Sequence, residues 1–252
     1  MKRILHTLKL KWPEYVLEII VIMIGILGAY ELNQWNDSRK LRIKEQQILR
    51  QLKSEYESNL IQLDEKILMR QEGMISALSI FQQIDDLSVI DENKLYLNLW
   101  TLIRDPTFDP IKNDIIETEN LRIIQNDSLI RLLSNWTSEV FQVQELELEY
   151  QKFRSEKLVP RLNKLGINRN INHALWKDGY SPTEALDKDT IYSINIGRTK
   201  KELALKKVLN DVELEGFIAS AMTFHKVTNI QSASLRDRIL KILELINREI
   251  KE

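Results

Sequence analysis

The strongest constraint on the fold is the apolar run YVLEIIVIMIGILGAYELNQW, which starts at Tyr15. Trp12 and Tyr15 stand at one end of this run and Tyr30 and Trp35 at the other, as aromatic residues do at the two interfaces of a membrane. A helix from Trp12 to Trp35 would be about 35 Å long, enough to cross a hydrocarbon core of about 30 Å. We therefore predict a transmembrane helix over residues 14–35, with these four aromatic residues as interfacial anchors.

The flanks of this run indicate how it is used. No small-residue cleavage site follows it, which favours an uncleaved signal anchor over a removable signal peptide. The alternative is a buried core helix of a soluble protein. Basic residues lie on both sides, so the positive-inside rule is nearly balanced; they are Lys2, Arg3, Lys9 and Lys11 before the run and Arg39, Lys40, Arg42 and Lys44 after it.

Two further arguments set the orientation. A short tail with four positive charges is hard to translocate, whereas a long downstream domain crosses largely regardless of its charge. We therefore predict a single-pass protein of the bacterial inner membrane. Its basic tail, residues 1–13, would be cytoplasmic, and its domain of residues 36–252 would be extracytoplasmic, which is periplasmic in a Gram-negative cell.

A carboxylate and two glycines interrupt the apolar run. At helical spacing Glu18, Gly25, Ala29 and Asn36 fall on one side of the helix. Small residues on one side let another helix approach closely, and a partner would reduce the cost of about 2.5–3.5 kcal/mol for a charge at mid-membrane. We predict that these four residues form a helix-packing face for an envelope protein or a second copy of the chain. The alternative is that Glu18 lies shallow enough to reach headgroup water.

Beyond the apolar run the chain has a helical pattern. No glycine or proline occurs between Asp37 and Gly73, and apolar residues recur every three or four positions with one skipped turn after Ile67. This predicts a stalk helix over about 36–86 that continues the membrane helix. The spacing averages about 3.67 residues, which does not favour a left-handed two-stranded coiled coil.

The rest of the chain predicts further helices. They are expected over about 91–104, 110–118, 126–165 and 199–251. Asp91 and either Asn126 or Asp127 are suitable N-caps, and the two prolines of DPTFDP would end the first of these helices. The predicted fold is therefore all-α, with an N-terminal transmembrane helix that continues into a stalk and then an antiparallel bundle of three to four long helices.

Smaller signals refine these elements. Pro160 predicts a kink, Asn120 would suit a left-handed C-cap, and SPTE at Ser181 is a capping box that predicts a short helix.

Composition and motifs provide no evidence for catalysis. The chain has 36 Lys and Arg against 37 Asp and Glu, a balance that argues against a nucleic-acid partner. It contains no cysteine, and its three histidines form no metal-binding spacing. We therefore predict no catalytic residue, no metal and no cofactor. His225 is expected at the edge of the core. The tryptophans Trp100, Trp136 and Trp176 are expected in the bundle core, and the alternative for them is a ligand cage.

The stretch EIIVIMIGILGAYELNQWND resembles the start of an uncharacterised bacterial family, domain-of-unknown-function family 6090. The matching positions are Glu18, Ile19, Gly25, Ile26, Leu27, Ala29, Asn33, Trp35 and Asn36. A second block, NLRIIQNDSLIRLLSNW, is similar to the central block of that family, with Asn120 where a glycine is usual. The resemblance implies a single-pass membrane protein with a helical extracytoplasmic domain and implies no activity.

Taken together, these features favour a membrane-anchored interaction or scaffold protein of the cell envelope, in contact with the lipid bilayer and with a protein partner. The alternative is a sensor or ion-coupled membrane subunit in which Glu18 would be a proton site.

Overall fold

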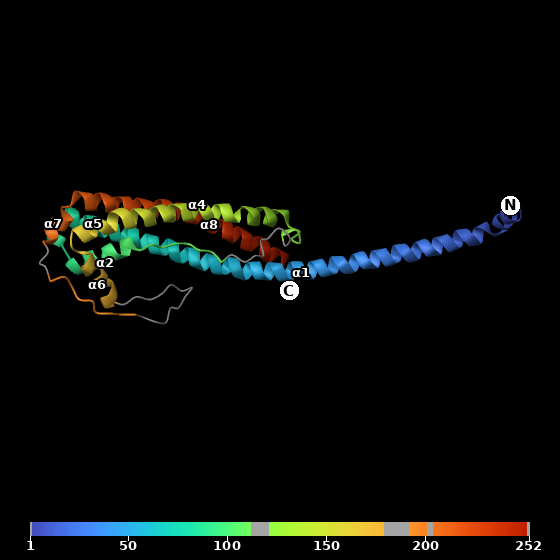
Figure 1. Cartoon of the computed structure of the whole chain (residues 1–252), viewed down its shortest axis with the longest axis horizontal. Coiled ribbons are helices and arrows are strands. Elements are labelled where there is room, and N and C mark those ends of the chain that lie inside the picture. Colours follow the sequence, from blue (N-terminus) through green and yellow to red (C-terminus); the bar gives the residue numbers. More distant parts are fainter. Residues whose placement is uncertain (1, 112–120, 179–191, 201–203, 251–252) are drawn as a thin grey trace.

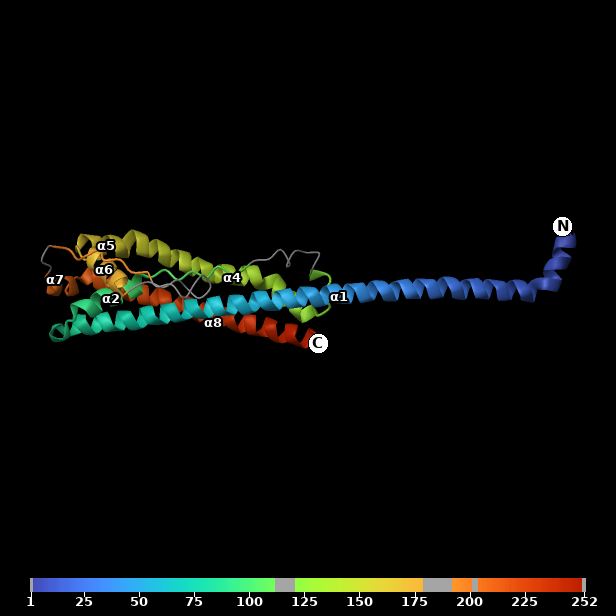
Figure 2. The ribbon, with the colours of Figure 1, turned by 90° about the horizontal axis from the view of Figure 1, so that it is seen from below.

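A single helix of 84 residues, α1 (Lys2–Asp85), runs through the whole length of the molecule (Figure 1). The computed structural model describes residues 2–111, 121–178, 192–200 and 204–250; in α1 it leaves out the side chains of residues 2–11, 14 and 15. At about 1.5 Å per residue α1 is about 125 Å long. Its N-terminal part projects alone, and its C-terminal part is one member of a helical bundle, as Figures 1 and 2 show.

Within the described residues the bundle contains three long helical segments. After a 3₁₀ turn, η1 (Leu87–Val89), the helix α2 (Glu92–Ile103) folds back along α1, and the other helices follow in the order α4 (Asp127–Phe153), α5 (Val159–Lys164), α6 (Asn168–Asp178), α7 (Leu205–Leu209) and α8 (Val212–Glu249). The helix α8 runs antiparallel to both α1 and α4 (Figure 2). The predicted all-α fold is therefore confirmed.

The caps explain why these helices start where they do. The side chain of Asp91 accepts a hydrogen bond from the N–H of Lys94, and that of Asn126 accepts one from Leu129. Each satisfies a backbone donor that has no partner within its helix. Between the two predicted candidates for the second cap, the structure selects Asn126. The helix predicted at 110–118, the C-cap at Asn120 and the SPTE helix at Ser181 all lie outside the described residues.

The predicted helix over 126–165 is one helical rod with a wider turn inside it. A π-helical turn, η3 (Arg154–Leu158), joins α4 to α5, and Pro160 follows this turn directly. Proline has no N–H, and its ring clashes with the carbonyl one turn earlier, so the backbone here departs from regular α-helix. Gly166 then ends the rod at φ 76°, a left-handed conformation that glycine adopts without strain.

The last helix begins later than predicted. The pattern placed its start near residue 199, but α8 begins at Val212, behind the N-cap Asp211, and the short helix α7 precedes it. The Asp211 carboxylate accepts the N–H of Leu214 at 2.8 Å and pairs with Arg161. These contacts separate α7 from α8, although apolar residues continue across the junction.

A fourth position in the bundle is filled partly by a segment that is not helical. We call residues Arg104–Ile111 the strap; it follows α2, has an extended backbone and lies between α1 and α4 (Figure 1). Two prolines, Pro106 and Pro110, keep it out of a helical conformation.

Candidate functional site

The projecting part of α1 is exposed wherever its side chains are described. Every described side chain from Val16 to Leu41 is exposed, and none of the most apolar 18-residue window is buried. This helix is long and apolar enough to span a membrane. The apolar run therefore does not form part of this chain's own core, which was the alternative to a membrane segment.

The predicted packing face is open in the single chain. Glu18, Ala29 and Asn36 are exposed, and a methyl group added at Gly25 would meet no atom within 4 Å. Trp12, Tyr30 and Trp35 of the predicted interfacial anchors are exposed as well, and the side chain of Tyr15 lies outside the description. Both sets of residues therefore remain predictions about a lipid or protein environment.

A polar clamp marks the level at which α1 enters the bundle. Glu45 is only 1% exposed, pairs with Arg42, and accepts the N–H of Gln125 at 2.8 Å. At the end of α8, Glu249 accepts hydrogen bonds from Gln46 through its carbonyl oxygen and from the Asn126 side chain through its carboxylate, both at 2.9 Å. These contacts tie the start of α4 and the end of α8 to one level of α1.

Two apolar clusters fill the bundle on either side of a buried polar layer. The cluster nearer the projecting helix contains the edge-to-face pair Tyr56 and Trp136, whose ring centroids are 4.9 Å apart. The cluster at the far end is built mainly on α2 and the first half of α8, with further residues from the end of α1 and from α7. Trp136 lies in the first cluster and Trp100 packs against the second, so these two residues do not share a ligand cage.

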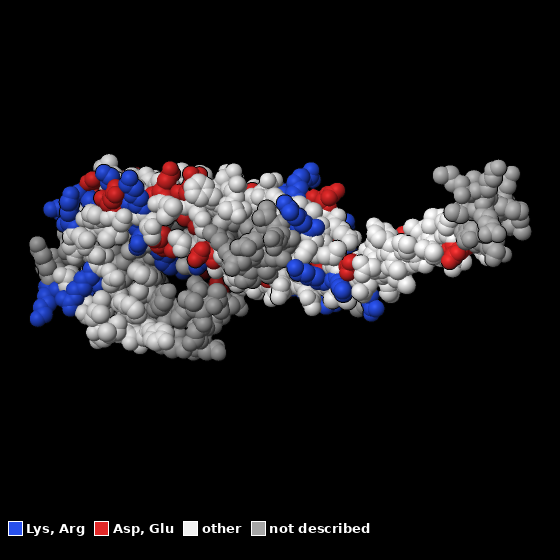
Figure 3. Space-filling model, turned by 45° about the vertical axis from the view of Figure 1, so that its right-hand side comes forward, with Lys and Arg blue, Asp and Glu red and all other residues white. Residues whose placement is uncertain are grey.

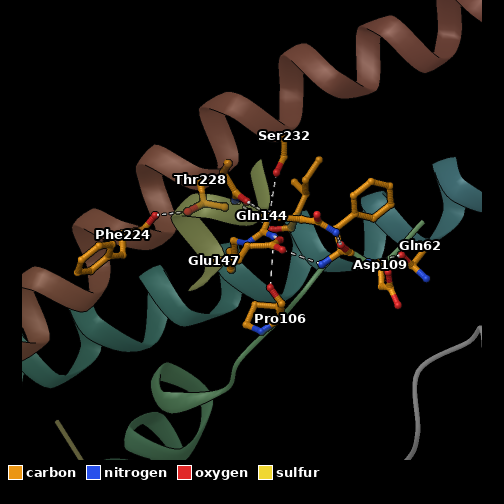
Figure 4. Close-up of polar contacts among 12 residues, drawn as sticks. Gln62, Pro106, Asp109, Gln144, Glu147, Phe224, Thr228 and Ser232 are labelled. Atoms are coloured by element: carbon orange, nitrogen blue, oxygen red, sulfur yellow. Dashed lines mark hydrogen bonds and ion pairs between the residues drawn. The ribbon is translucent and has the colours of Figure 1, made fainter. Parts of the chain in front are cut away.

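The centre of the polar layer is Arg70, which is 1% exposed. Its guanidinium pairs with Glu147 of α4 and donates to Ser232 of α8 at 3.0 Å and to the carbonyl of Pro106 in the strap at 3.3 Å. Figure 4 shows Ser232 and Pro106 on opposite sides of the group that contains Glu147. One side chain of α1 thus contacts α4, α8 and the strap.

Glu147 completes the charge balance of this layer. It is 4% exposed; one carboxylate oxygen faces Arg70 and the other accepts the N–H of Phe108 at 2.9 Å. Burial raises the pKa of the Glu147 carboxyl to about 7, and Arg70 opposes that rise. A buried ion pair of this kind is costly to break, because removing one partner leaves the other charge uncompensated.

His225 lies beside this layer, deep in the core and not at its edge as predicted. It is 2% exposed, and its Nε2 lies 3.1 Å from the carbonyl oxygen of Leu102. Its ring packs against that of Tyr150 in a tilted arrangement, with the ring centroids 4.6 Å apart. Space for the ring exists because Gly73 has no side chain: a methyl group there would lie 2.9 Å from the imidazole. Burial lowers the pKa of His225 to about 4, so the ring is neutral at neutral pH.

These two groups predict opposite effects of acid on stability. The pKa of Glu147 is about 7 in the folded protein and 4.5 in the unfolded chain. Its protonated form therefore stabilises the fold fully below about pH 4.5, and this contribution is lost as the pH rises through 7. The pKa of His225 is about 4 in the folded protein and 6.5 in the unfolded chain. Its neutral form therefore stabilises the fold fully above pH 6.5, and this contribution is lost as the pH falls toward 4.

Between pH 7.5 and pH 5 each group should change the free energy of unfolding by about 2 kcal/mol: acidification raises it through Glu147 and lowers it through His225. Urea denaturation should therefore show that Glu147→Gln makes the protein less stable on acidification and that His225→Gln makes it more stable. The wild-type protein should change less than either variant. The same pH dependence in all three proteins would contradict the assignment.

Among the described residues, no group of three or more histidine, cysteine, aspartate or glutamate side chains could hold a metal ion. On the face of the molecule that Figure 3 shows, charged side chains are scattered over the bundle, whereas the described part of the projecting helix is mostly uncharged.

The fold and these sites place the chain among all-helical proteins. One long helix begins as an exposed apolar segment and continues into a bundle that contains a buried ion pair. Residues 18–104 match the model of a family of unknown function (DUF6090). The match includes the first block of the predicted resemblance and extends to the end of α2; the second block lies outside it. Searches among curated proteins and solved structures find no match.

Proposed function

We propose that this chain is a single-pass scaffold protein of the bacterial cell envelope, anchored by the N-terminal part of α1. The observation that carries the proposal is the complete exposure of the apolar window of α1. An apolar surface of this size on a soluble protein would mark an interaction site or lead to aggregation, and an exposed helix of this length fits a hydrocarbon core. The bundle would then lie outside the bilayer, with its base at the clamp of Glu45.

The positive charges on the two flanks are nearly balanced, so the orientation rests on two other arguments: a short tail with four positive charges is hard to translocate, and a long downstream domain crosses largely regardless of its charge. The basic tail of residues 1–13 would remain in the cytoplasm, and the bundle would be extracytoplasmic. The resemblance to a bacterial family supports the inner membrane as the location. A long rigid helix between the bilayer and the bundle would hold the bundle at a fixed distance from the membrane surface, which suits a scaffold.

A role in binding rather than catalysis is supported by how the buried polar groups are used. The Arg70 guanidinium and both oxygens of Glu147 are occupied by contacts within the protein. His225 is held against the carbonyl oxygen of Leu102. These contacts connect α1, α4 and α8 with one another and with the strap, so the groups serve in binding within the protein.

The face of Glu18, Gly25, Ala29 and Asn36 is the part of the scaffold that would contact another membrane helix. Because the chain has no cysteine, single cysteines can be introduced at Gly25 or Ala29 and coupled to a photoreactive maleimide in native membranes. We expect crosslinks to protein, either a second copy or another envelope protein. Leu27→Cys, at the same depth on the opposite side of the helix, is the matched control and should react mainly with lipid. Equal protein crosslinking at all three positions, or none, would contradict the packing face.

A further inference from the structure

The strap is bound to the bundle in the manner of an extended peptide. Its side chains alternate: Pro106, Phe108 and Pro110 are buried, whereas Thr107 and Asp109 are exposed. This period of two is that of an extended chain with one side against a surface. Phe108 is 1% exposed and is part of the apolar cluster nearer the projecting helix, so it is the main apolar anchor of the strap.

The main chain of the strap is held by side chains. Three of its N–H groups donate to oxygens of α1 and α4: Phe108 to Glu147 at 2.9 Å, Asp109 to Gln62 at 3.0 Å and Ile111 to Asn59 at 2.8 Å. Three of its carbonyl groups accept from the same two helices: Pro106 from Arg70 at 3.3 Å, Phe108 from Gln144 at 3.0 Å and Ile111 from Asn59 at 3.3 Å.

These contacts define a groove between α1 and α4 whose polar side chains bind a peptide backbone. Figure 4 shows Gln62 beside Asp109, and Gln144 and Glu147 at the centre of the same group. Backbone contacts depend little on sequence, so selectivity would come from the alternate side chains that face the groove. The ligand chemistry is therefore an extended segment with an apolar, an aromatic and an apolar residue at every second position.

We propose that the groove between α1 and α4 is a binding site for an extended peptide segment of a protein partner, and that the strap is its resident, exchangeable occupant. A tethered segment has an effective concentration on the order of millimolar, so an incoming segment must bind more strongly than the strap or arrive when the strap is weakened. The cellular role of this site rests on the proposed scaffold function. The binding itself needs no membrane partner, so its failure would leave the membrane anchor untouched.

The test uses the full chain in detergent with Phe108→Ala, which removes the anchor of the strap and leaves the groove intact. The probe is a fluorescent peptide with the strap sequence RDPTFDPI, and anisotropy measures its binding. We expect the peptide to bind this variant at least tenfold more tightly than the wild-type protein, whose groove is occupied. A peptide with alanine in place of phenylalanine, RDPTADPI, should bind the variant at least tenfold more weakly than the original.

Circular dichroism and the unfolding temperature complete the test. The variant should retain its helical content, and the original peptide should raise its unfolding temperature. Absence of binding, or equal binding of both peptides, would overturn the proposal. Loss of the fold with and without peptide would overturn it too, because the strap would then be an indispensable part of the core.

Discussion

Replacing Arg70 by methionine should lower the free energy of unfolding of the full chain by about 3–5 kcal/mol. The reason is the charge left behind: Glu147 is 4% exposed and would lose its cationic partner inside the bundle. The carbonyl of Pro106 and the hydroxyl of Ser232 would each lose a donor as well. Urea denaturation followed by circular dichroism at pH 7.5 measures the loss.

The matched control removes both charges together. Arg70→Met combined with Glu147→Leu replaces the ion pair by apolar groups, so no uncompensated charge remains, and most of the lost stability should return. If the double variant is as unstable as the single one, the ion pair is not the source of the loss. If the single variant is as stable as wild type, Arg70 is not the centre of the buried layer.

Deleting residues 1–35 should convert the protein from membrane-bound to soluble. The deletion removes the apolar window and retains the whole bundle, whose base lies at the clamp of Glu45 with Gln125. Ultracentrifugation of lysed cells should place the full chain in the membrane pellet and the shortened chain in the supernatant. Circular dichroism should show that the soluble form is helical.

A deletion of residues 2–11 is the control for this experiment, because it removes charges of the tail but keeps the apolar run. This variant should remain in the membrane pellet. If the chain that lacks residues 1–35 stays in the pellet after a carbonate wash, another part of the chain binds the membrane, which would contradict the prediction.

The path of α1 could be predicted because its determinants are local. A stretch without glycine or proline and with regular apolar spacing favours one long helix, and the N-caps at Asp91 and Asn126 act over three residues. The start of α8 was missed although Asp211 stands directly before it. Apolar residues from α7 continue the pattern across that cap, so periodicity alone could not separate the two helices.

The polar layer could not be predicted, because its members come together only in the packed bundle. Arg70 and Glu147 are 77 positions apart, and only the register between α1 and α4 makes them partners. One signal was present: the skipped turn after Ile67 is the turn in which Arg70 lies. A charged residue at a position where an apolar one is due indicates a buried partner, but it does not say which residue that is.

The prediction of His225 at the core edge rests only on its position beside Phe224 on an amphipathic helix. Its burial depends on Gly73, which lies on a different helix and leaves space for the ring. The strap was predicted only as a helix terminator. Its contacts with Asn59, Gln62 and Gln144 depend on the distance between two helices, which sequence periodicity does not give.

The most direct test of the membrane anchor and its orientation is the accessibility of single cysteines to a membrane-impermeant maleimide in intact spheroplasts. Ser234→Cys places a thiol on the exposed side of α8, and Lys9→Cys places one in the N-terminal tail. A bundle carried outside the cytoplasmic membrane by α1 predicts labelling of the Ser234 variant in intact spheroplasts and labelling of the Lys9 variant only after lysis. The reverse pattern, or equal labelling of both variants before lysis, would contradict it.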